Sequence, residues 1–187
     1  KTVGVIADNP ETGVTEVARP IGVIGAITPS TNPGATPANK IINALKGGNA
    51  IILAPSPKGA KVCAKLIEFI YTEFDKISAP HDLVQMLPRP VDKTTTHLLM
   101  AAVDLIVATG SQSNIRAAYS SGTPALGVGA GNVAVIIDTD AELPSAAKKI
   151  AQSKCFDNAT SCSSENSLVI LDSVYEPMIE ALVAAGG

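Results

Sequence analysis

Aromatic residues are scarce in this 187-residue sequence: they make up 3% of it, and tryptophan is absent. Hydrophobic residues make up 46%. A core must therefore be filled by valine, isoleucine, leucine and alanine, which favours helices packed on a parallel sheet rich in Val and Ile. The length allows one domain and the start of a second.

Basic residues are too scattered to form a patch. The formal net charge is −3, so nucleic acid and anionic membrane surfaces are not expected partners. No apolar run reaches the length of a transmembrane helix, and residues 1–8 lack the long apolar stretch of a signal peptide. We therefore expect a cytoplasmic protein without a membrane partner.

Cysteine and histidine are also rare. Three cysteines, Cys63, Cys155 and Cys162, cannot all pair, and nothing in their spacing suggests a disulfide framework. The two histidines, His81 and His97, lie far from any paired cysteine, so no metal site is expected. Cys63 and Cys155 are interpreted as small buried hydrophobes.

An initiator methionine is missing as well, and the sequence stops directly after a helical pattern. We expect a fragment of a longer protein, with part of its active site outside the sequence.

What the sequence contains is an alternation of apolar runs and amphipathic stretches, preceded by a hairpin over residues 2–18 with its turn at 9–13. Strands are expected at 21–27, 50–53, 83–87, 105–108, 133–137 and 168–171, and helices at 36–46, 58–75, 92–101, 113–121, 142–154 and 173–185. This order predicts right-handed βαβ crossovers and an α/β fold with a mostly parallel sheet and flanking helices.

Ligands bind at the carboxyl ends of the strands in such a sheet. The loops there are 28–34, 54–58, 88–91 and 109–114. Thr109-Gly110-Ser111 is the best phosphate candidate, because Gly110 permits close backbone approach and the next helix offers free N–H groups. An ordinary strand-to-helix turn fits the same residues, so both interpretations stay open on this motif alone.

A second glycine-rich run, Gly127-Val128-Gly129-Ala130-Gly131, leads into a strand and not a helix. It therefore fails the structural test for a dinucleotide-binding fingerprint. We interpret it as backbone that passes close to a ligand or to another segment.

The segment 155–166 is dense in small polar residues between a helix and a buried strand. A cysteine there is expected to be reachable by solvent or substrate, which makes Cys162 a candidate nucleophile. No histidine stands nearby in sequence to activate it, and a buried structural cysteine is the alternative.

Taken together, these segments resemble the aldehyde dehydrogenase superfamily over essentially the whole chain and in the same order. Asn32 follows Thr28-Pro29-Ser30-Thr31, where the superfamily carries a Pro-x-Asn-Phe-Pro-like loop. The resemblance implies that the Asn32 side chain is an oxyanion donor. Thr109-Gly110-Ser111 matches the cofactor phosphate loop, and Phe156-Asp157-Asn158 followed by Cys162 matches the segment that carries the nucleophile.

The resemblance also implies a Rossmann-like fold of the aldehyde dehydrogenase type. Residues 1–155 would form the nicotinamide cofactor-binding domain with the N-terminal hairpin, and residues 156–187 the start of the catalytic domain. The residues expected to contact NAD or NADP are Thr28, Pro29, Ser30, Thr31, Pro55, Ser56, Thr109, Gly110, Ser111, Gly127, Val128 and Gly129.

One departure from the superfamily pattern is informative. Hydrolytic members carry a Glu that activates the deacylating water, and Gly127 stands at that position here. The glycine run is similar to that of the CoA-acylating branch, including the aldehyde dehydrogenase half of bifunctional aldehyde-alcohol dehydrogenases. Without a base for water, a thioester survives until the thiol of coenzyme A takes the acyl group.

A second departure concerns the cofactor. Hydrolytic members usually have a Lys and a Glu that contact the adenosine ribose, and Ala54 and Pro57 replace them. Losing the acidic group removes repulsion against a 2′-phosphate, which Lys58 could help to bind. NADP use is therefore compatible with the sequence, but acylating members that use NAD also lack these residues.

Within the branch, residues 30–37 and 158–166 resemble acylating sulfoacetaldehyde dehydrogenases. The implied function is NAD(P)-dependent oxidation of an aldehyde to acyl-CoA through a thioester on Cys162, by a homo-oligomer. Two alternatives stay open: a hydrolytic enzyme that gives the free acid, and a truncated nucleotide-binding module without catalysis.

Overall fold

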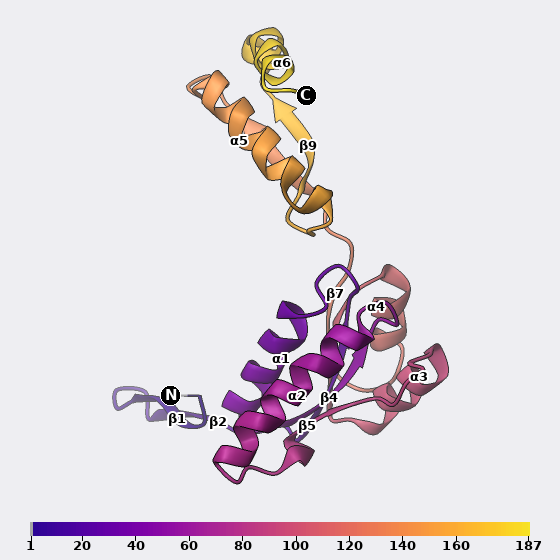
Figure 1. Cartoon of the computed structure of the whole chain (residues 1–187). Coiled ribbons are helices and arrows are strands. Elements are labelled where there is room, and N and C mark those ends of the chain that lie inside the picture. Colours follow the sequence, from indigo (N-terminus) through magenta and orange to yellow (C-terminus); the bar gives the residue numbers. More distant parts are fainter. Residues whose placement is uncertain (1) are drawn as a thin grey trace. The chain divides into compact units, whose positions relative to one another are not determined.

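A computed structural model describes residues 2–187 of the chain. The chain forms two compact units, Lys1–Gly129 and Ala130–Gly187. Each unit has its own hydrophobic core, and Figure 1 follows the elements of each along the sequence.

A five-stranded sheet forms the centre of the first unit. It consists of β3 (Val23–Thr28), β4 (Ala50–Pro55), β5 (Val84–Met86), β6 (Leu105–Thr109) and β7 (Ala125–Val128), in the order β5-β4-β3-β6-β7. Every neighbouring pair is parallel. The predicted α/β fold with a mostly parallel sheet is thus confirmed.

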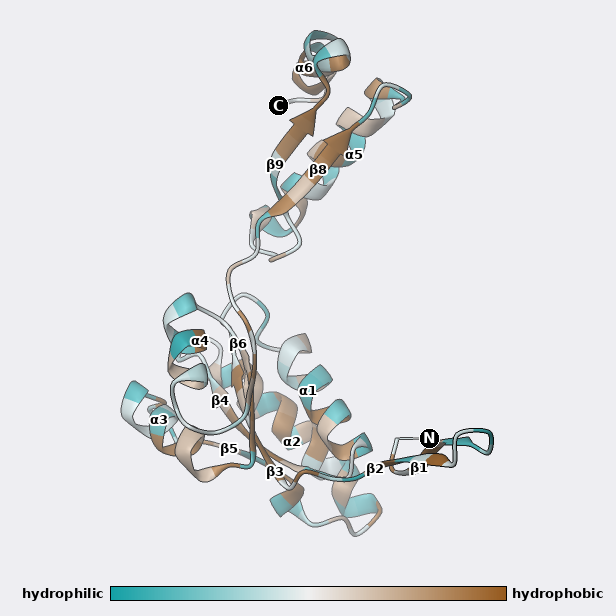
Figure 2. Cartoon of the chain, turned by 180° about the vertical axis from the view of Figure 1, so that it is seen from behind, coloured by the Kyte–Doolittle hydropathy of each residue, from teal (hydrophilic) through white to brown (hydrophobic). Residues whose placement is uncertain are grey.

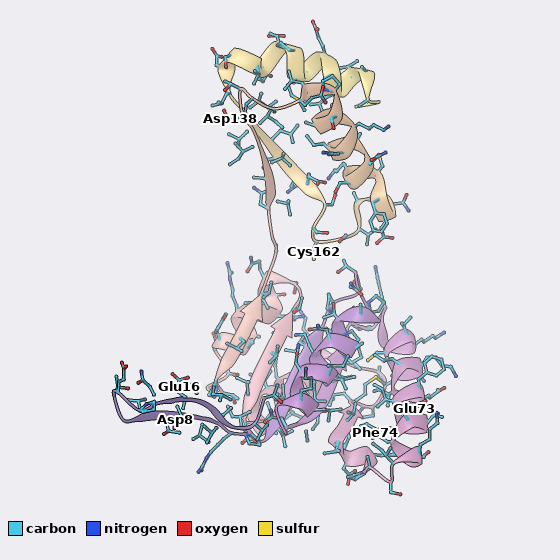
Figure 3. The ribbon with its side chains drawn as sticks, turned by 90° about the vertical axis from the view of Figure 1, so that its left-hand side faces the viewer. Asp8, Glu16, Glu73, Phe74, Asp138 and Cys162 are labelled. Carbon is cyan, nitrogen blue, oxygen red and sulfur yellow. The ribbon has the colours of Figure 1, made fainter. Side chains whose placement is uncertain are left out.

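Helices cover both faces of this sheet. Helices α1 (Ala35–Lys46) and α2 (Ala60–Lys76) share one core with β3, β4 and β5, whereas α3 (Lys93–Ala102) and α4 (Gln112–Tyr119) share another with β3 and β6. The strands are coloured as hydrophobic along much of their length in Figure 2. This agrees with alternate side chains entering the two cores. On α2, the buried Phe74 points toward the sheet and the exposed Glu73 away from it (Figure 3).

The N-terminal hairpin is confirmed. Strands β1 (Gly4–Asn9) and β2 (Val14–Ala18) pair antiparallel. The turn is held by the Asn9 side chain, whose Oδ1 accepts from the Glu11 and Thr12 amides, and Gly13 takes a positive φ of 68°. Valine side chains of both strands are exposed, among them Val14 and Val17.

The second unit contains a parallel pair, β8 (Val133–Ile137) and β9 (Glu165–Ile170). Helices α5 (Leu143–Cys155) and α6 (Tyr175–Ala184) pack against each other, and the core is built around Ile137, Ala147 and Met178. Short 3₁₀ turns lie at Phe156–Ala159 and Asp172–Val174, and a third, His81–Leu83, precedes β5 in the first unit.

Two features differ from the expectation. Strand β7 was not expected, because its glycine run lacks the apolar pattern of a buried strand. The chain also divides into its two compact units between residues 129 and 130. The expected domain boundary at 155/156 falls at the end of α5, inside the second unit. The reason is that β8 pairs with β9 and so joins the residues on both sides of α5. The assignment of a function to each domain stays a prediction.

Candidate active site

The first unit offers a binding crevice where the strand order reverses. From β3 the chain proceeds to β4 and β5 on one side, and then returns to place β6 and β7 on the other side. Such a switch point opens a crevice at the carboxyl ends of the two central strands. The loop that contains Asn32 follows β3, and Thr109 is the last residue of β6, so both predicted ligand loops lie at this point.

The predicted phosphate loop has the features of an anion site. Ser111 is the N-cap of α4, and its Oγ accepts from the Asn114 amide at 3.4 Å and contacts Ser113 Oγ at 2.9 Å. The first amides of α4 have no partner within the helix and point toward the loop. A Cβ added to Gly110 would meet only Asn114, at 3.7 Å, so the backbone there is open to a ligand.

The glycine run lies directly beside this loop. Strand β7 pairs with β6, and the Gly110 amide donates to the Val128 carbonyl at 3.2 Å. The structure therefore brings the predicted phosphate loop, residues 109–111, next to residues 127–129. This agrees with the prediction that both sets of residues bind one cofactor. Whether they contact a cofactor stays a prediction.

A cavity of about 610 Å³ opens between the carboxyl ends of β3 and β4 and helices α3 and α4. Thr28, Pro55 and Ser56, three of the predicted cofactor residues, line it. Thr28 is 2% exposed, and its Oγ1 has no hydrogen-bond partner among the described residues. A buried hydroxyl without a partner is costly, so a polar group of a ligand in the cavity would satisfy it.

The cavity also shows the surroundings of Ala54 and Pro57, which replace the Lys and Glu expected from hydrolytic members. Ala54 and Pro57 form part of its wall, while the exposed Lys58 is not among the described residues that line it. The cation at the cavity is Lys93, next to Asp92 at the start of α3. Hydrogen bonds from the Thr95 amide and hydroxyl hold the pKa of Asp92 below its usual value, so this carboxylate is ionised at neutral pH.

Asn32 has a fixed orientation. Its Oδ1 accepts from the Ala35 amide at 3.1 Å, at the start of α1. This contact uses the oxygen of the carboxamide and leaves the Nδ2 NH₂ group to donate to another acceptor. Asn32 lines a second pocket, of about 330 Å³, together with Lys40 and Thr109. The remaining predicted residues of the loop, Pro29, Ser30 and Thr31, join β3 to Asn32.

Sequence reasoning missed Lys40. Its side chain lies partly buried between α1 and the sheet, and its Nζ donates to the Val107 carbonyl at 2.7 Å. Burial lowers its pKa to about 8. Nothing in the helical pattern distinguishes this lysine from a surface lysine such as Lys46, so no signal in the sequence would have found it.

The structure explains why residue 127 is a glycine. A Cβ there would lie 2.9 Å from Ile115 Cγ2 and 3.0 Å from Tyr119 Cε2, both on α4. Ile115 is buried, so a side chain at residue 127 would force the Ile115 side chain to shift. The interpretation of this run as backbone that passes close to another segment is confirmed.

Cys162 belongs to the second unit, in the loop between the turn at Phe156–Ala159 and β9 (Figure 3). Its side chain is exposed, as expected for a reactive cysteine. Within the loop, the hydroxyls of Ser161 and Ser163 lie 2.9 Å apart. Just before it, Asp157, Asn158 and Ala159 have φ between 50° and 56°, an unfavourable conformation for non-glycine residues that is enriched at functional sites.

The other two cysteines differ from each other. Cys63 is fully buried in the core, and burial raises its pKa to about 11, which agrees with a structural role. The same expectation was wrong for Cys155, which is exposed. It is the last residue of α5 and leads into the polar segment, where no apolar partner covers it.

Two general findings apply to the described residues. Between residues 2 and 187, no three or more His, Cys, Asp or Glu side chains gather in a way that could hold a metal ion. Over the same range, no helix combines the length and the apolar character needed to cross a bilayer.

Comparisons with known proteins give a consistent result. The sequence model described as "Aldehyde dehydrogenase family" matches residues 2–186. An acylating sulfoacetaldehyde dehydrogenase of Cupriavidus necator is 67% identical over 187 residues, which is 100% of this chain and 38% of that protein.

Solved structures agree. An acetylating aldehyde dehydrogenase from Geobacillus thermoglucosidasius has a TM-score of 0.89 and 39% identity, over 98% of this chain and 41% of that one. A propionaldehyde dehydrogenase from Rhodopseudomonas palustris, with bound CoA and an acylated cysteine, has a TM-score of 0.80 and 32% identity, over 89% of this chain and 38% of that one. The chain thus spans about two fifths of the length of these proteins.

Proposed function

The chain belongs to the aldehyde dehydrogenase family, and from that premise we propose that it carries the cofactor site and the nucleophile of a CoA-acylating enzyme. The reaction is the reversible oxidation of an aldehyde to an acyl-CoA. The observation that carries the proposal is the packing at Gly127, where a side chain able to supply a carboxylate for water would clash with Ile115 and Tyr119. The acylating relatives support it.

Cys162 is the nucleophile of the proposal. Its thiolate attacks the aldehyde carbon, and the carbonyl oxygen becomes an oxyanion. Asn32 Nδ2, which the Ala35 contact leaves available, and the backbone amide of Cys162 donate hydrogen bonds to that oxygen. Loss of hydride from the former aldehyde carbon then leaves an acyl thioester on Cys162.

The residues of the first unit fit a nicotinamide dinucleotide. The unpartnered Thr28 hydroxyl, with Pro55 and Ser56, suits the adenosine end, and Ser111 with the N-terminus of α4 suits the pyrophosphate. The bound nicotinamide supplies the hydride acceptor. The absence of an acidic group at Ala54 and Pro57 and the presence of Lys93 are compatible with NADP as well as NAD.

Coenzyme A is the proposed second substrate. With Gly127 in place of a base, the thioester on Cys162 is slow to react with water, and the CoA thiolate displaces Cys162 to form acyl-CoA. The Rhodopseudomonas palustris protein with bound CoA and an acylated cysteine supports this step. Sulfoacetaldehyde is the proposed aldehyde because of the 67% identical relative, and a cytoplasmic homo-oligomer completes the proposal.

The test is a product analysis with the intact protein. A panel of aldehydes that includes sulfoacetaldehyde is assayed with NAD or NADP, with and without CoA. We expect acyl-CoA as product and little turnover without CoA. Release of the free acid at an unchanged rate without CoA would support the hydrolytic alternative. Cofactor binding without turnover of any aldehyde would support a non-catalytic nucleotide-binding module.

A further inference from the structure

Among the described residues of the first unit, Lys40 is the titratable group that lies partly buried at the site and has no role in the proposed function. Its Nζ meets the Val107 carbonyl at 2.7 Å. None of its neighbours in the pocket carries a charge: the other lining residues are Asn32, Ala35, Thr36, Asn39 and Thr109. The strands packed beside it, β3, β4 and β6, contain no titratable side chain either. Its charge is therefore uncompensated within this part of the structure.

The pocket is also where the reacting end of the cofactor belongs if the proposed function holds. Hydride transfer requires contact between the nicotinamide and the carbon whose oxygen Asn32 holds. Asn32, Thr109 and Lys40 line the same pocket, so under the proposed function the ring would lie near Lys40. An oxidised nicotinamide carries a positive charge and a reduced one is neutral. An ammonium group at Lys40 would thus repel the ring only before the hydride has been transferred.

We propose that Lys40 is uncharged when the oxidised cofactor binds and takes up the proton that aldehyde oxidation releases. This inference rests on the proposed function. In net terms, aldehyde, Cys162 thiol and oxidised nicotinamide would give the Cys162 thioester, reduced nicotinamide and one proton. That proton is the one the Cys162 thiol loses when it becomes the attacking thiolate, and the neutral Nζ of Lys40 binds one proton once the ring is reduced. Neutral Lys40 favours binding of the oxidised cofactor before hydride transfer. Protonated Lys40 is compatible with the neutral, reduced cofactor after hydride transfer.

The burial of Lys40 makes this exchange feasible near neutral pH. A lysine in water keeps its proton up to a pKa of about 10.4, whereas burial brings the pKa of Lys40 to about 8. A positively charged nicotinamide ring beside Lys40 would lower the pKa of Lys40 further. Reduction of the ring would remove its charge, and the pKa of Lys40 would rise again. If the ring lowers the pKa by about one unit, affinity for the oxidised cofactor rises about fivefold between pH 7 and pH 9.

The test measures cofactor binding and not turnover. Dissociation constants of the oxidised and reduced cofactor are determined for the intact protein between pH 6.5 and pH 9 by calorimetry, a range of about 2.5 units around the pKa of Lys40. We expect the affinity for the oxidised form to rise with pH in the wild type and the affinity for the reduced form to change little. Lys40→Met should bind the oxidised form with a flat pH profile. Lys40→Arg, which stays charged, should bind it weakly at every pH.

Lys46→Met is the matched control, because Lys46 is an exposed lysine of the same helix, and it should keep the wild-type profile. Equal pH profiles in the wild type and Lys40→Met would overturn the inference and leave the proposed function intact. Failure of either cofactor to bind at any pH would overturn both. Should Lys40→Met not fold, the wild-type lysines can be dimethylated with ¹³C and titrated by NMR. The same Lys40 pKa in both cofactor complexes would then refute the inference.

Discussion

The amide of Gly127 donates to the hydroxyl of Tyr119 at 3.0 Å, and the ring of Tyr119 occupies the space that a side chain at residue 127 would need. This contact ties the edge strand β7 to α4, the helix whose N-terminus forms the predicted phosphate site. The glycine lets the strand lie against the helix. Under the proposed function, the lack of a side chain at this residue also leaves no base there to activate water.

The first prediction concerns this contact. Gly127→Ala places a Cβ 2.9 Å from the buried Ile115 side chain, so we expect a loss of about 1–3 kcal/mol in the free energy of unfolding. Urea denaturation measures it. Gly131→Ala is the control, because a Cβ at that glycine meets nothing within 4 Å, and its effect should stay within about 0.5 kcal/mol. Equal losses in the two variants would contradict the packing argument.

Asn32 can be tested by a substitution that separates its two roles. Asn32→Asp keeps an oxygen for the Ala35 amide but removes the Nδ2 donor. Turnover should fall about 10²–10³-fold, as for loss of an oxyanion donor, while the thermal unfolding temperature stays close to that of the wild type. Asn32→Ala should lower both turnover and the thermal unfolding temperature, since it also removes the contact with α1. Near-normal turnover in Asn32→Asp would show that another group holds the oxyanion.

The two exposed cysteines form a natural pair for comparison. Cys162→Ala should abolish turnover, by at least about a thousandfold, and leave binding of the nicotinamide cofactor unchanged, because the predicted cofactor residues lie in the first unit. Cys155→Ala, seven positions earlier in the sequence and also exposed, should retain turnover within about twofold. The reverse pattern would identify Cys155 as the nucleophile.

Cys63 should be inert in the folded protein. Its pKa of about 11 leaves about 0.1% thiolate at pH 8, and no part of its side chain reaches solvent. Iodoacetamide at pH 8 should therefore modify Cys155 and Cys162 but not Cys63, which mass spectrometry of the digested protein can show. Modification of Cys63 at a similar rate without denaturant would mean that α2 opens away from the sheet.

Lys40 should also affect stability in a pH-dependent way. Its pKa is about 8 in the folded protein against 10.5 ordinarily. Between these values the unfolded chain binds a proton that the folded chain does not, so this lysine adds stability as pH rises through the window. Lys40→Met removes the dependence. The free energy of unfolding of Lys40→Met, relative to that of the wild type, should be highest below pH 8. It should decline to a constant value above about pH 10.5. A constant difference at all pH values would mean that Lys40 titrates normally.

The sequence predicted the regular elements because each depends on a local pattern. The apolar run of β4 and the helical spacing of Ile67, Ile70 and Phe74 on α2 can be recognised without knowing what they pack against. The candidate ligand loops at 28–34 and 109–114 were found in the same way, because each follows an apolar strand. The role of Asn32, in contrast, was implied only by the family resemblance. Strand β7 escaped prediction because it has only four residues and Gly127 interrupts its apolar run.

Sequence alone therefore determined the α/β class, the order of the strands and helices other than β7, and the residue types at the ends of β3 and β6. These follow from short-range periodicity and from the chemistry of single side chains. Only the tertiary structure decided which groups are desolvated and which have partners. The burial of Lys40, the unpartnered hydroxyl of Thr28, the exposure of Cys155 and the closed space at Gly127 all depend on segments distant in sequence. No local pattern records such contacts, since water is excluded from a side chain by its neighbours in space and not by those along the chain.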